Sequence, residues 1–224
     1  IICELLGAPK EDWKLFSRLA TDVLRIFGSD LATELPTIMA AQEELDEYTR
    51  GLIAERRSVP LDDLLTDLIS AEEAGDKLSN EELVMMVEAV IVGGTDTTRN
   101  QLGLALALFA EHPDQWELLR NDPSLAPRAV EEVMRYNGAV GGTIRFASED
   151  IEYNGVLFPK GTFMSTSMAT GNFDAAVFPE PNTFNIMRPP VGQPHLSLGA
   201  GIHYCLGASL ARAELQEAFT VLAD

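Results

Sequence analysis

Cysteine is scarce in this sequence of 224 residues, which contains only Cys3 and Cys205. Two cysteines this far apart, in unlike surroundings, do not form a disulfide framework, so we expect a protein of the reducing cytoplasm. Cys3 lies in an apolar opening segment, where a buried structural thiol is expected. Cys205 stands among glycines close to the end of the chain and needs its own explanation.

Basic residues and long apolar runs are also scarce. The chain has 16 Lys and Arg against 35 Asp and Glu, and its formal net charge of −19 argues against a nucleic-acid partner. The most apolar stretch, residues 83–91, contains Glu88 and is soon followed by two glycines and Asp96, so no membrane span is predicted. The start of the chain lacks the basic segment and cleavage site of a signal peptide.

With 46% apolar and 23% charged residues, the composition is that of a globular protein with a sizeable core. The chain begins without Met and stops inside a helical pattern, so we interpret it as a fragment of a longer protein. The pattern predicts a mainly helical fold with a small antiparallel sheet. Expected helices start at Glu11, Pro36, Leu61, Ser79, Pro113 and Pro127, with a last one after Cys205; expected strands cover 143–146, 151–153 and 156–158, the last two joined by a turn at Asn154-Gly155.

The helix expected at about 80–111 carries a local conflict in its middle. Gly93 and Gly94 each cost a helix interior about 1 kcal/mol relative to alanine. Asp96 and Thr97 add side chains that compete for backbone hydrogen bonds. Such conflicts tend to mark functional sites, although a tolerated kink is the simpler alternative.

Cys205 lies in a loop, residues 195–207, that contains Gly199, Gly201 and Gly207 and precedes a helix-forming run. Glycines permit unusual backbone angles and the close approach of a flat ligand. A thiolate is the metal-binding form of cysteine, and a helix N-terminus favours it. A lone cysteine is more often a buried apolar residue, but its neighbours favour a ligand here.

These segments resemble the cytochrome P450 family. The loop matches the haem-thiolate pattern F-G-x-G-x-H-x-C-x-G at its three glycines, His203 and Cys205, while Leu198 replaces the usual phenylalanine. That replacement affects packing around the sulfur, and with it the redox potential, more than ligation. The helix matches [AG]-G-x-[DE]-T through Asp96 and Thr97, which the resemblance implies are catalytic. Thr97 would hydrogen-bond dioxygen and Asp96 would help to relay protons.

Further residues match the family pattern. Glu132 and Arg135 fit E-x-x-R, which the resemblance implies is a structural pair, although the bare motif is usually a surface ion pair. The usual third partner is replaced by Thr183, so the triad either closes elsewhere or remains a pair. Arg145 and His203 match groups that bind the haem propionates; an exposed strand residue is the alternative for Arg145.

Two further features concern packing and charge. Phe173 replaces the arginine of the family's N-R-D, which we interpret as a local packing change. Residues 181–213 contain no acidic residue, while their basic residues include Arg188 and Arg212. This favours the thiolate and would suit an acidic redox partner, although burial of the segment explains it equally well.

The resemblance implies the later part of a single cytochrome P450 domain of the soluble bacterial type. The cofactor would be haem b, with Cys205 as axial iron ligand. Electrons would come from NAD(P)H through a ferredoxin and its reductase. By position, the pocket residues would be Ala89, Val92, Gly93, Thr97 and Val140, which suit a hydrophobic small-molecule substrate.

Two alternatives remain open. A haem-thiolate sensor or electron carrier would need no proton relay, so Asp96 and Thr97 count against it. A zinc module could use His195, His203 and Cys205, but zinc sites favour closely paired ligands and no second cysteine lies near.

Overall fold

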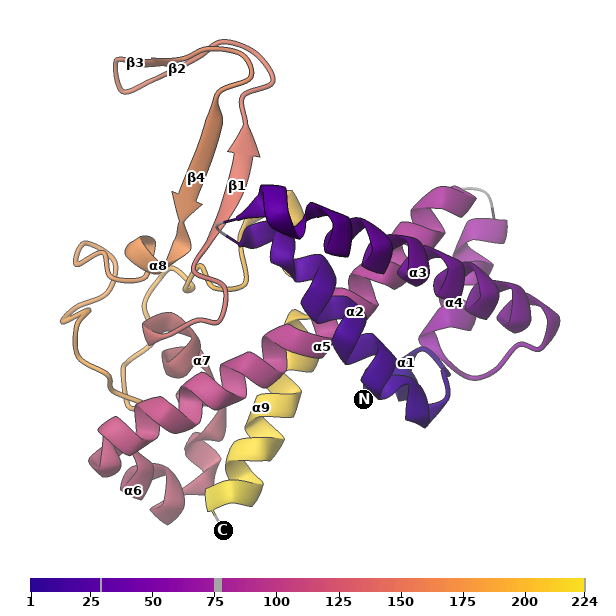
Figure 1. Cartoon of the computed structure of the whole chain (residues 1–224). Coiled ribbons are helices and arrows are strands. Elements are labelled where there is room, and N and C mark those ends of the chain that lie inside the picture. Colours follow the sequence, from indigo (N-terminus) through magenta and orange to yellow (C-terminus); the bar gives the residue numbers. More distant parts are fainter. Residues whose placement is uncertain (29, 75–77, 224) are drawn as a thin grey trace. The chain divides into compact units, whose positions relative to one another are not determined.

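The computed structural model describes residues 1–28, 30–74 and 78–223, and the chain divides into two compact units, Ile1–Thr97 and Thr98–Asp224. Each unit is described by itself. Helix α5 (Asn80–Glu111) contributes to both units (Figure 1). Helices dominate, as predicted. No helix formed by the described residues is both long and apolar enough to cross a membrane.

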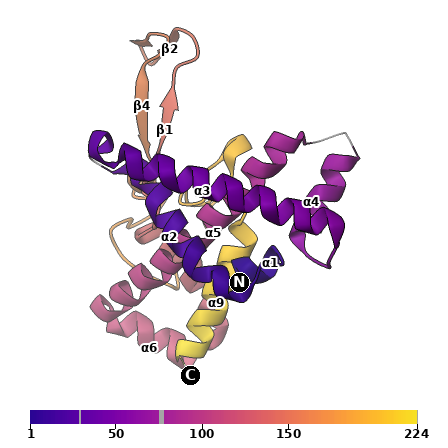
Figure 2. The same ribbon diagram turned by 45° about the vertical axis from the view of Figure 1, so that its right-hand side comes forward.

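The first unit is helical. It contains α1 (Ile2–Leu5), α2 (Trp13–Leu24), α3 (Leu31–Ser58), α4 (Leu64–Glu73) and the first part of α5, with short 3-10 turns at Lys10–Asp12 and Arg25–Phe27. Helix α2 packs against α3 and runs obliquely to it in both views (Figures 1 and 2). Cys3 is buried here as a free thiol, as predicted, and burial raises its pKa.

Helix α3 begins five residues before the predicted start at Pro36. Its N-cap is Asp30, whose carboxylate accepts a hydrogen bond from Thr33 N at 3.3 Å. Pro36 lies in the second turn, where its missing N–H removes a single helical hydrogen bond. The same capping explains why α4 begins at Leu64 instead of Leu61, because Asp63 accepts from Thr66 N at 2.8 Å.

The capping box at the start of α5 is confirmed. Ser79 N donates to Glu82 Oε2 at 2.8 Å, and Glu82 N donates to Ser79 Oγ at 3.3 Å. From Asn80 the helix continues without a break to Glu111, across Gly93 and Gly94. The two glycines therefore lower the intrinsic stability of this helix without ending it.

A buried ion pair lies beneath a tight turn near the start of the chain. Arg56 Nε is 2.8 Å from Asp63 Oδ2, and both side chains are at most 4% exposed. Arg56 Nη2 also donates to Gly7 O at 2.8 Å. Gly7 has a φ of 62°, and a Cβ built there would lie 2.0 Å from Asp63 Oδ2. Only glycine fits this position without displacing the ion pair.

We expect Gly7→Ala to destabilise the first unit. The left-handed backbone alone costs alanine about 1–2 kcal/mol, and disturbing the pair beneath it adds to that loss. Gly51→Ala is the matched control, because Gly51 lies inside α3 and a Cβ there meets no atom within 4 Å. That change should stabilise the protein by about 0.5–1 kcal/mol. Urea unfolding of both variants tests this, and equal effects would contradict it.

The second unit combines helices with two short antiparallel ladders. Its elements are the rest of α5, α6 (Pro113–Asn121), α7 (Ala126–Tyr136), β1 (Gly142–Phe146), β2 (Ile151–Tyr153), β3 (Val156–Phe158), β4 (Phe163–Ser167), α8 (Met168–Gly171) and α9 (Ala208–Ala223), with 3-10 turns at Pro123–Leu125 and Gly201–His203. Its core joins helices α5, α6, α7 and α9 through buried side chains that include Phe109, Leu119, Val133, Phe184 and Phe219. The core thereby holds α7 and α9, the two helices that flank the cysteine loop.

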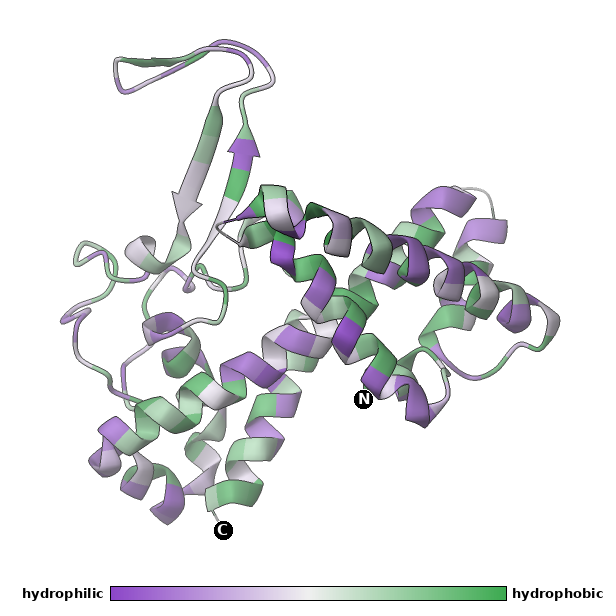
Figure 3. Cartoon of the chain, in the orientation of Figure 1, coloured by the Kyte–Doolittle hydropathy of each residue, from purple (hydrophilic) through white to green (hydrophobic). Residues whose placement is uncertain are grey.

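The predicted antiparallel strands are confirmed, with one difference in pairing. β2 pairs with β3 through the expected turn, where Asn154 and Gly155 have φ values of 50° and 75°. β1 pairs instead with β4, with Arg145 opposite Met164, so the described residues form two ladders rather than one sheet. In Figure 3, a green segment of β1 is followed by a purple one. β4 was missed because its sequence, Phe-Met-Ser-Thr-Ser, does not alternate between apolar and polar residues.

Candidate functional site

The cysteine loop is shaped by backbone hydrogen bonds and two glycines in the left-handed region. Gly199 N donates to Leu196 O and Cys205 N donates to Leu198 O, each at 2.8 Å. Gly199 and Gly201 have φ values of 74° and 69°. A Cβ at Gly199 would also lie 3.3 Å from His203 O. Glycine is therefore needed at Gly199 to close the loop.

Cys205 is a free and exposed thiol just before α9. Its apolar neighbours are also exposed, with Ile202 at 96% and Leu206 at 75%. A Cβ built at Gly201 or Gly207 would meet no atom within 4 Å. An accessible sulfur beside exposed apolar side chains and glycines with free space around them suits a flat, largely apolar cofactor that contains a metal, such as haem.

The two proposed propionate ligands are exposed and belong to the same unit as Cys205. Arg145 lies on β1, where its Nη1 donates to Thr143 Oγ1 at 3.0 Å and to Ile144 O at 2.8 Å. His203 lies in the 3-10 turn of the cysteine loop. Both partners of Arg145 belong to its own strand, so its position is compatible with a propionate ligand and with an ordinary strand residue.

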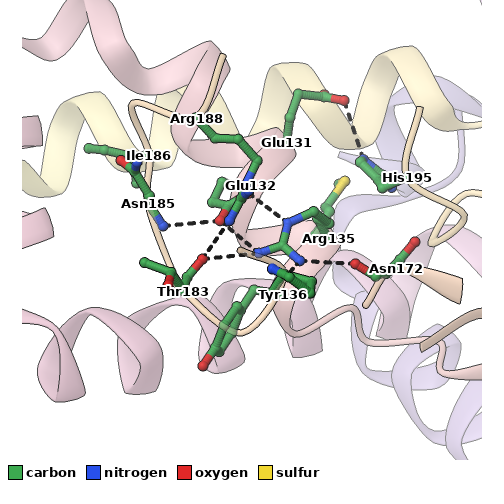
Figure 4. A network of polar contacts seen from close by, with 12 residues as sticks. Glu131, Glu132, Arg135, Tyr136, Asn172, Thr183, Asn185, Ile186, Arg188 and His195 are labelled. Atoms are coloured by element: carbon green, nitrogen blue, oxygen red, sulfur yellow. Dashed lines mark hydrogen bonds and ion pairs between the residues drawn. The ribbon is translucent and has the colours of Figure 1, made fainter. Parts of the chain in front are cut away.

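Glu132 and Arg135 form a buried pair rather than a surface contact. Their side chains are 3% and 2% exposed, and two hydrogen bonds of 2.8 Å join the guanidinium to the carboxylate (Figure 4). Arg188 Nε donates to Glu132 Oε2 at 2.9 Å and so closes the triad. Glu132 Oε1 also accepts from Asn185 N at 3.0 Å. The carboxylate thus neutralises two cations in the core of the second unit.

Arg135 also organises the irregular segment that follows α8. Its Nη1 donates to Asn172 O at 3.0 Å and to Pro181 O at 2.9 Å. The guanidinium carbon lies 5.5 Å from the ring centroids of Tyr136, Phe173 and Phe178. Phe173 thus helps to enclose the buried cation, consistent with the packing role that we expect for this replacement.

A second polar group lies next to the first and has no counterpart in the sequence prediction. Arg212 binds Glu131 through Nε at 2.6 Å and Nη2 at 3.1 Å. His195 Nε2 lies 3.2 Å from Glu131 Oε2, a close contact that lacks hydrogen-bond geometry (Figure 4). Burial by itself raises the pKa of Glu131. The contacts with His195 and Arg212 have the larger effect together, and they lower the pKa to about 2. The sequence offered one signal for this contact, the absence of acidic residues from 181–213. A basic residue in that segment, such as Arg212, can find an acidic partner only in another part of the chain.

The lowered pKa of Glu131 predicts a pH dependence of stability. Because the folded-state pKa lies below the ordinary value of 4.5, the carboxylate stabilises the fold above pH 4.5 and loses this effect as the pH falls toward 2. Wild type should therefore exceed Glu131→Gln in unfolding free energy at pH 6. Urea unfolding at pH 6 and pH 3 tests this, and the difference should shrink at pH 3. An unchanged difference would contradict the assignment.

Asp96 and Thr97 belong to α5 in the first unit. Asp96 is buried, and its Oδ2 accepts a hydrogen bond from Thr21 Oγ1 at 3.3 Å. Thr97 Oγ1 donates to Gly93 O at 2.5 Å, within the same helix. The acid and the alcohol are thus neighbours in sequence, but each already has a partner in its own unit.

The predicted pocket residues divide between the two units. Ala89, Val92 and Gly93 lie on α5 at spacings that place them on one helix face. Val140 belongs to the second unit, just before β1, and is 41% exposed. The pocket therefore stays a prediction.

The structure does not favour the zinc alternative. His195 is buried against Glu131, and its Nδ1 accepts a hydrogen bond from Ser197 N at 3.2 Å. Within residues 1–28, 30–74 and 78–223, no three His, Cys, Asp or Glu side chains are grouped to hold a metal ion.

The comparisons with known proteins identify the family of the chain. The Cytochrome P450 family model matches residues 10–222, so the chain belongs to the cytochrome P450 family. It is 38% identical to a steroid C26-monooxygenase of Mycobacterium tuberculosis, over 96% of this chain and 58% of that protein. It is 40% identical to a vitamin D(3) 25-hydroxylase of Pseudonocardia autotrophica, over 96% and 52%. The chain thus spans about half the length of these relatives.

Solved structures show the same fold. Mycobacterium smegmatis CYP164A2 with econazole bound has a TM-score of 0.90 and 35% identity, covering 99% of this chain and 56% of that one. P450BioI, in complex with an acyl carrier protein ligated to hexadec-9Z-enoic acid, has a TM-score of 0.89 and 33% identity, over 99% and 56%. The mainly helical fold predicted from the sequence is therefore part of the cytochrome P450 fold, since the chain covers about half of these structures.

Proposed function

We propose that the protein is a haem-thiolate monooxygenase that inserts one oxygen atom of dioxygen into a hydrophobic small organic substrate. The observation that carries this proposal is Cys205, a free and exposed thiol in a loop whose backbone turns depend on glycines. Family membership and the monooxygenase and hydroxylase names of the relatives support it.

The residues of the second unit would hold the cofactor. Cys205 would be the axial ligand of haem b, while Arg145 and His203 would neutralise the propionates. Gly199, Gly201 and Gly207 would shape the loop and leave space beside the ring. When bound, the haem supplies the iron centre at which dioxygen is reduced.

The catalytic residues of the first unit would control protons. Thr97 Oγ1 now donates to Gly93 O, and a rotation about its Cα–Cβ bond would free the hydroxyl for dioxygen. Asp96 is buried and can pass a proton from its side of the helix to water beside that hydroxyl. A carrier or sensor has no use for such a relay, which favours the monooxygenase over the second haem-thiolate class.

The substrate and partners follow from the same proposal. Ala89, Val92, Gly93 and Val140 are small or apolar, which suits an apolar substrate. The two relatives named for a steroid and for vitamin D(3) support that class. Electrons would arrive from NAD(P)H through a ferredoxin and its reductase, and we place the protein in the cytoplasm.

Replacing Cys205 tests the cofactor assignment in the full-length protein. Reduced wild type under carbon monoxide should show the red-shifted Soret band of a thiolate-ligated haem, because the sulfur donates electron density to the iron. Cys205→His should lose that band because imidazole replaces the thiolate. Absorption spectra before and after reduction measure both states.

Cys3→Ala is the matched control. Cys3 is buried in the first unit and has no proposed role in ligation, so this variant should keep the band. A normal thiolate band in Cys205→His, or its loss in Cys3→Ala alone, would overturn the assignment of Cys205.

A further inference from the structure

Glu131 uses both carboxylate oxygens to bind the two sides of the cysteine loop. Oε1 accepts from Arg212 Nε at 2.6 Å, while Oε2 accepts from Arg212 Nη2 at 3.1 Å and lies 3.2 Å from His195 Nε2. Glu131 lies on α7, whereas Arg212 lies on α9 and His195 begins the loop. One carboxylate therefore joins three segments that are distant in sequence.

Arg212 extends this contact to the residue before the cysteine. Its remaining terminal nitrogen, Nη1, donates to the hydroxyl of Tyr204 at 2.9 Å. Two nitrogens of the guanidinium face Glu131 and the third faces Tyr204, so the planar group fixes the distance between them. Tyr204 is bonded directly to Cys205, and the link from Glu131 thus ends one peptide from the sulfur.

The contact at the other side of the loop fixes the orientation of the imidazole. His195 Nδ1 accepts a hydrogen bond from Ser197 N at 3.2 Å, so in the neutral ring the proton lies on Nε2, facing Glu131. Ser197 Oγ in turn donates to Met134 O at 2.6 Å, on α7. Both sides of the loop are therefore attached to the same helix.

We propose that Glu131 is a positioning residue that holds the cysteine loop closed from both sides, through His195 and through Arg212 with Tyr204. Its role toward the haem rests on the proposed function, whereas its role in ordering the loop does not. Arg212 is thereby paired with Glu131 rather than a free cation beside Cys205.

Hydrogen exchange of the loop amides, measured in the full-length protein without added haem, tests the ordering role. Glu131→Gln, Arg212→Gln and Tyr204→Phe should each speed exchange at Cys205 N, which now donates to Leu198 O, by about tenfold or more. The double variant Glu131→Gln, Arg212→Gln should add little to Glu131→Gln, because that change already weakens the contact with Arg212.

Glu117→Gln is the control, since Glu117 pairs with Arg120 at 3.6 Å where both side chains are more than half exposed. It should leave exchange in the loop unchanged. Tyr204→Phe keeps the test decisive if Glu131→Gln does not fold, because it removes a single hydroxyl. Loop exchange equal to wild type in Tyr204→Phe and in every folded variant would overturn the proposal.

A spectrum of the haem-loaded protein separates this proposal from the proposed function. Under mild denaturant, the three variants should lose the thiolate band under carbon monoxide several-fold faster than wild type and Glu117→Gln. Arg212→Lys should not restore wild-type behaviour, because lysine lacks the fork that reaches both partners. If wild type itself shows no thiolate band, the assignment of Cys205 as the haem ligand is wrong. The hydrogen-exchange result then still tests whether Glu131 orders the loop.

Discussion

Glu132→Ala is expected to cost the second unit about 3–5 kcal/mol, because it leaves buried cations without their counter-charge. Arg135 is 2% exposed, and the side chain of Arg188 is 11% exposed. Neither guanidinium can reach solvent without disturbing the segment whose carbonyls it binds. For many domains this loss approaches the whole stability, so the variant should fold poorly or lose its haem.

Glu117→Ala provides the comparison, because its partner Arg120 lies on the surface and the pair is 3.6 Å apart. That change should alter stability by less than about 1 kcal/mol. Urea or thermal unfolding of both variants, with haem content measured in parallel, gives the result. A Glu132→Ala protein with wild-type melting temperature and haem content would show that the triad contributes little.

The motif at Glu132 was identifiable from the sequence, but its third partner was not. The family pattern directs attention to the residue before Phe184, which here is Thr183. Thr183 contributes its backbone carbonyl, to which Arg188 Nη2 donates at 2.6 Å, and the cation itself comes from five residues further along. The sequence spacing along an irregular segment does not determine which residue a long side chain contacts. The identity of the third partner of Glu132 and Arg135 therefore depends on the tertiary structure.

The count of charged residues did not show how the basic residues of 181–213 are paired. Residues 181–213 carry no acidic residue, which was compatible with an exposed basic face for a redox partner. In the structure Arg188 is directed onto Glu132, Arg212 onto Glu131, and His195 is buried. The acidic partners come from α7, more than fifty residues earlier. Arg188 and Arg212 thus have acidic partners, but burial does not explain the lack of acidic residues, because most of residues 181–213 are exposed or half-buried.

The predicted start of a helix was wrong where a capping residue lay before the proline that was taken as the first residue. Pro36 predicts a helix start, yet Asp30 caps α3 six residues earlier because its carboxylate reaches Thr33 N. By contrast, the Ser79–Glu82 box and the Asn154-Gly155 turn were predicted correctly, since each depends on contacts within four residues. Contacts between residues close in sequence could be predicted. The pairing of β1 with β4 could not, because sixteen residues separate the two strands.

Asp96→Asn is expected to slow product formation by about 100-fold or more, because general acid–base groups contribute about 10²–10⁴-fold. The amide keeps the shape of the carboxylate and can still accept the hydrogen bond from Thr21, so the helix should stay intact.

Thr97→Ala should act differently. It removes the hydroxyl and raises helix propensity, so the fold should survive while protons reach the wrong oxygen atom. NAD(P)H would still be consumed, with hydrogen peroxide replacing much of the product.

Thr95→Ala is the matched control for Thr97→Ala. Thr95 Oγ1 donates to Ile91 O at 2.6 Å, the same contact within α5 that Thr97 makes with Gly93. Its loss should leave turnover and coupling unchanged if only the position of the Thr97 hydroxyl matters. Product, peroxide and NAD(P)H consumption must be measured together in the full-length protein with its redox partners. If Asp96→Asn and Thr97→Ala both keep wild-type rate and coupling, the two residues are structural and the sensor or carrier class becomes the better proposal.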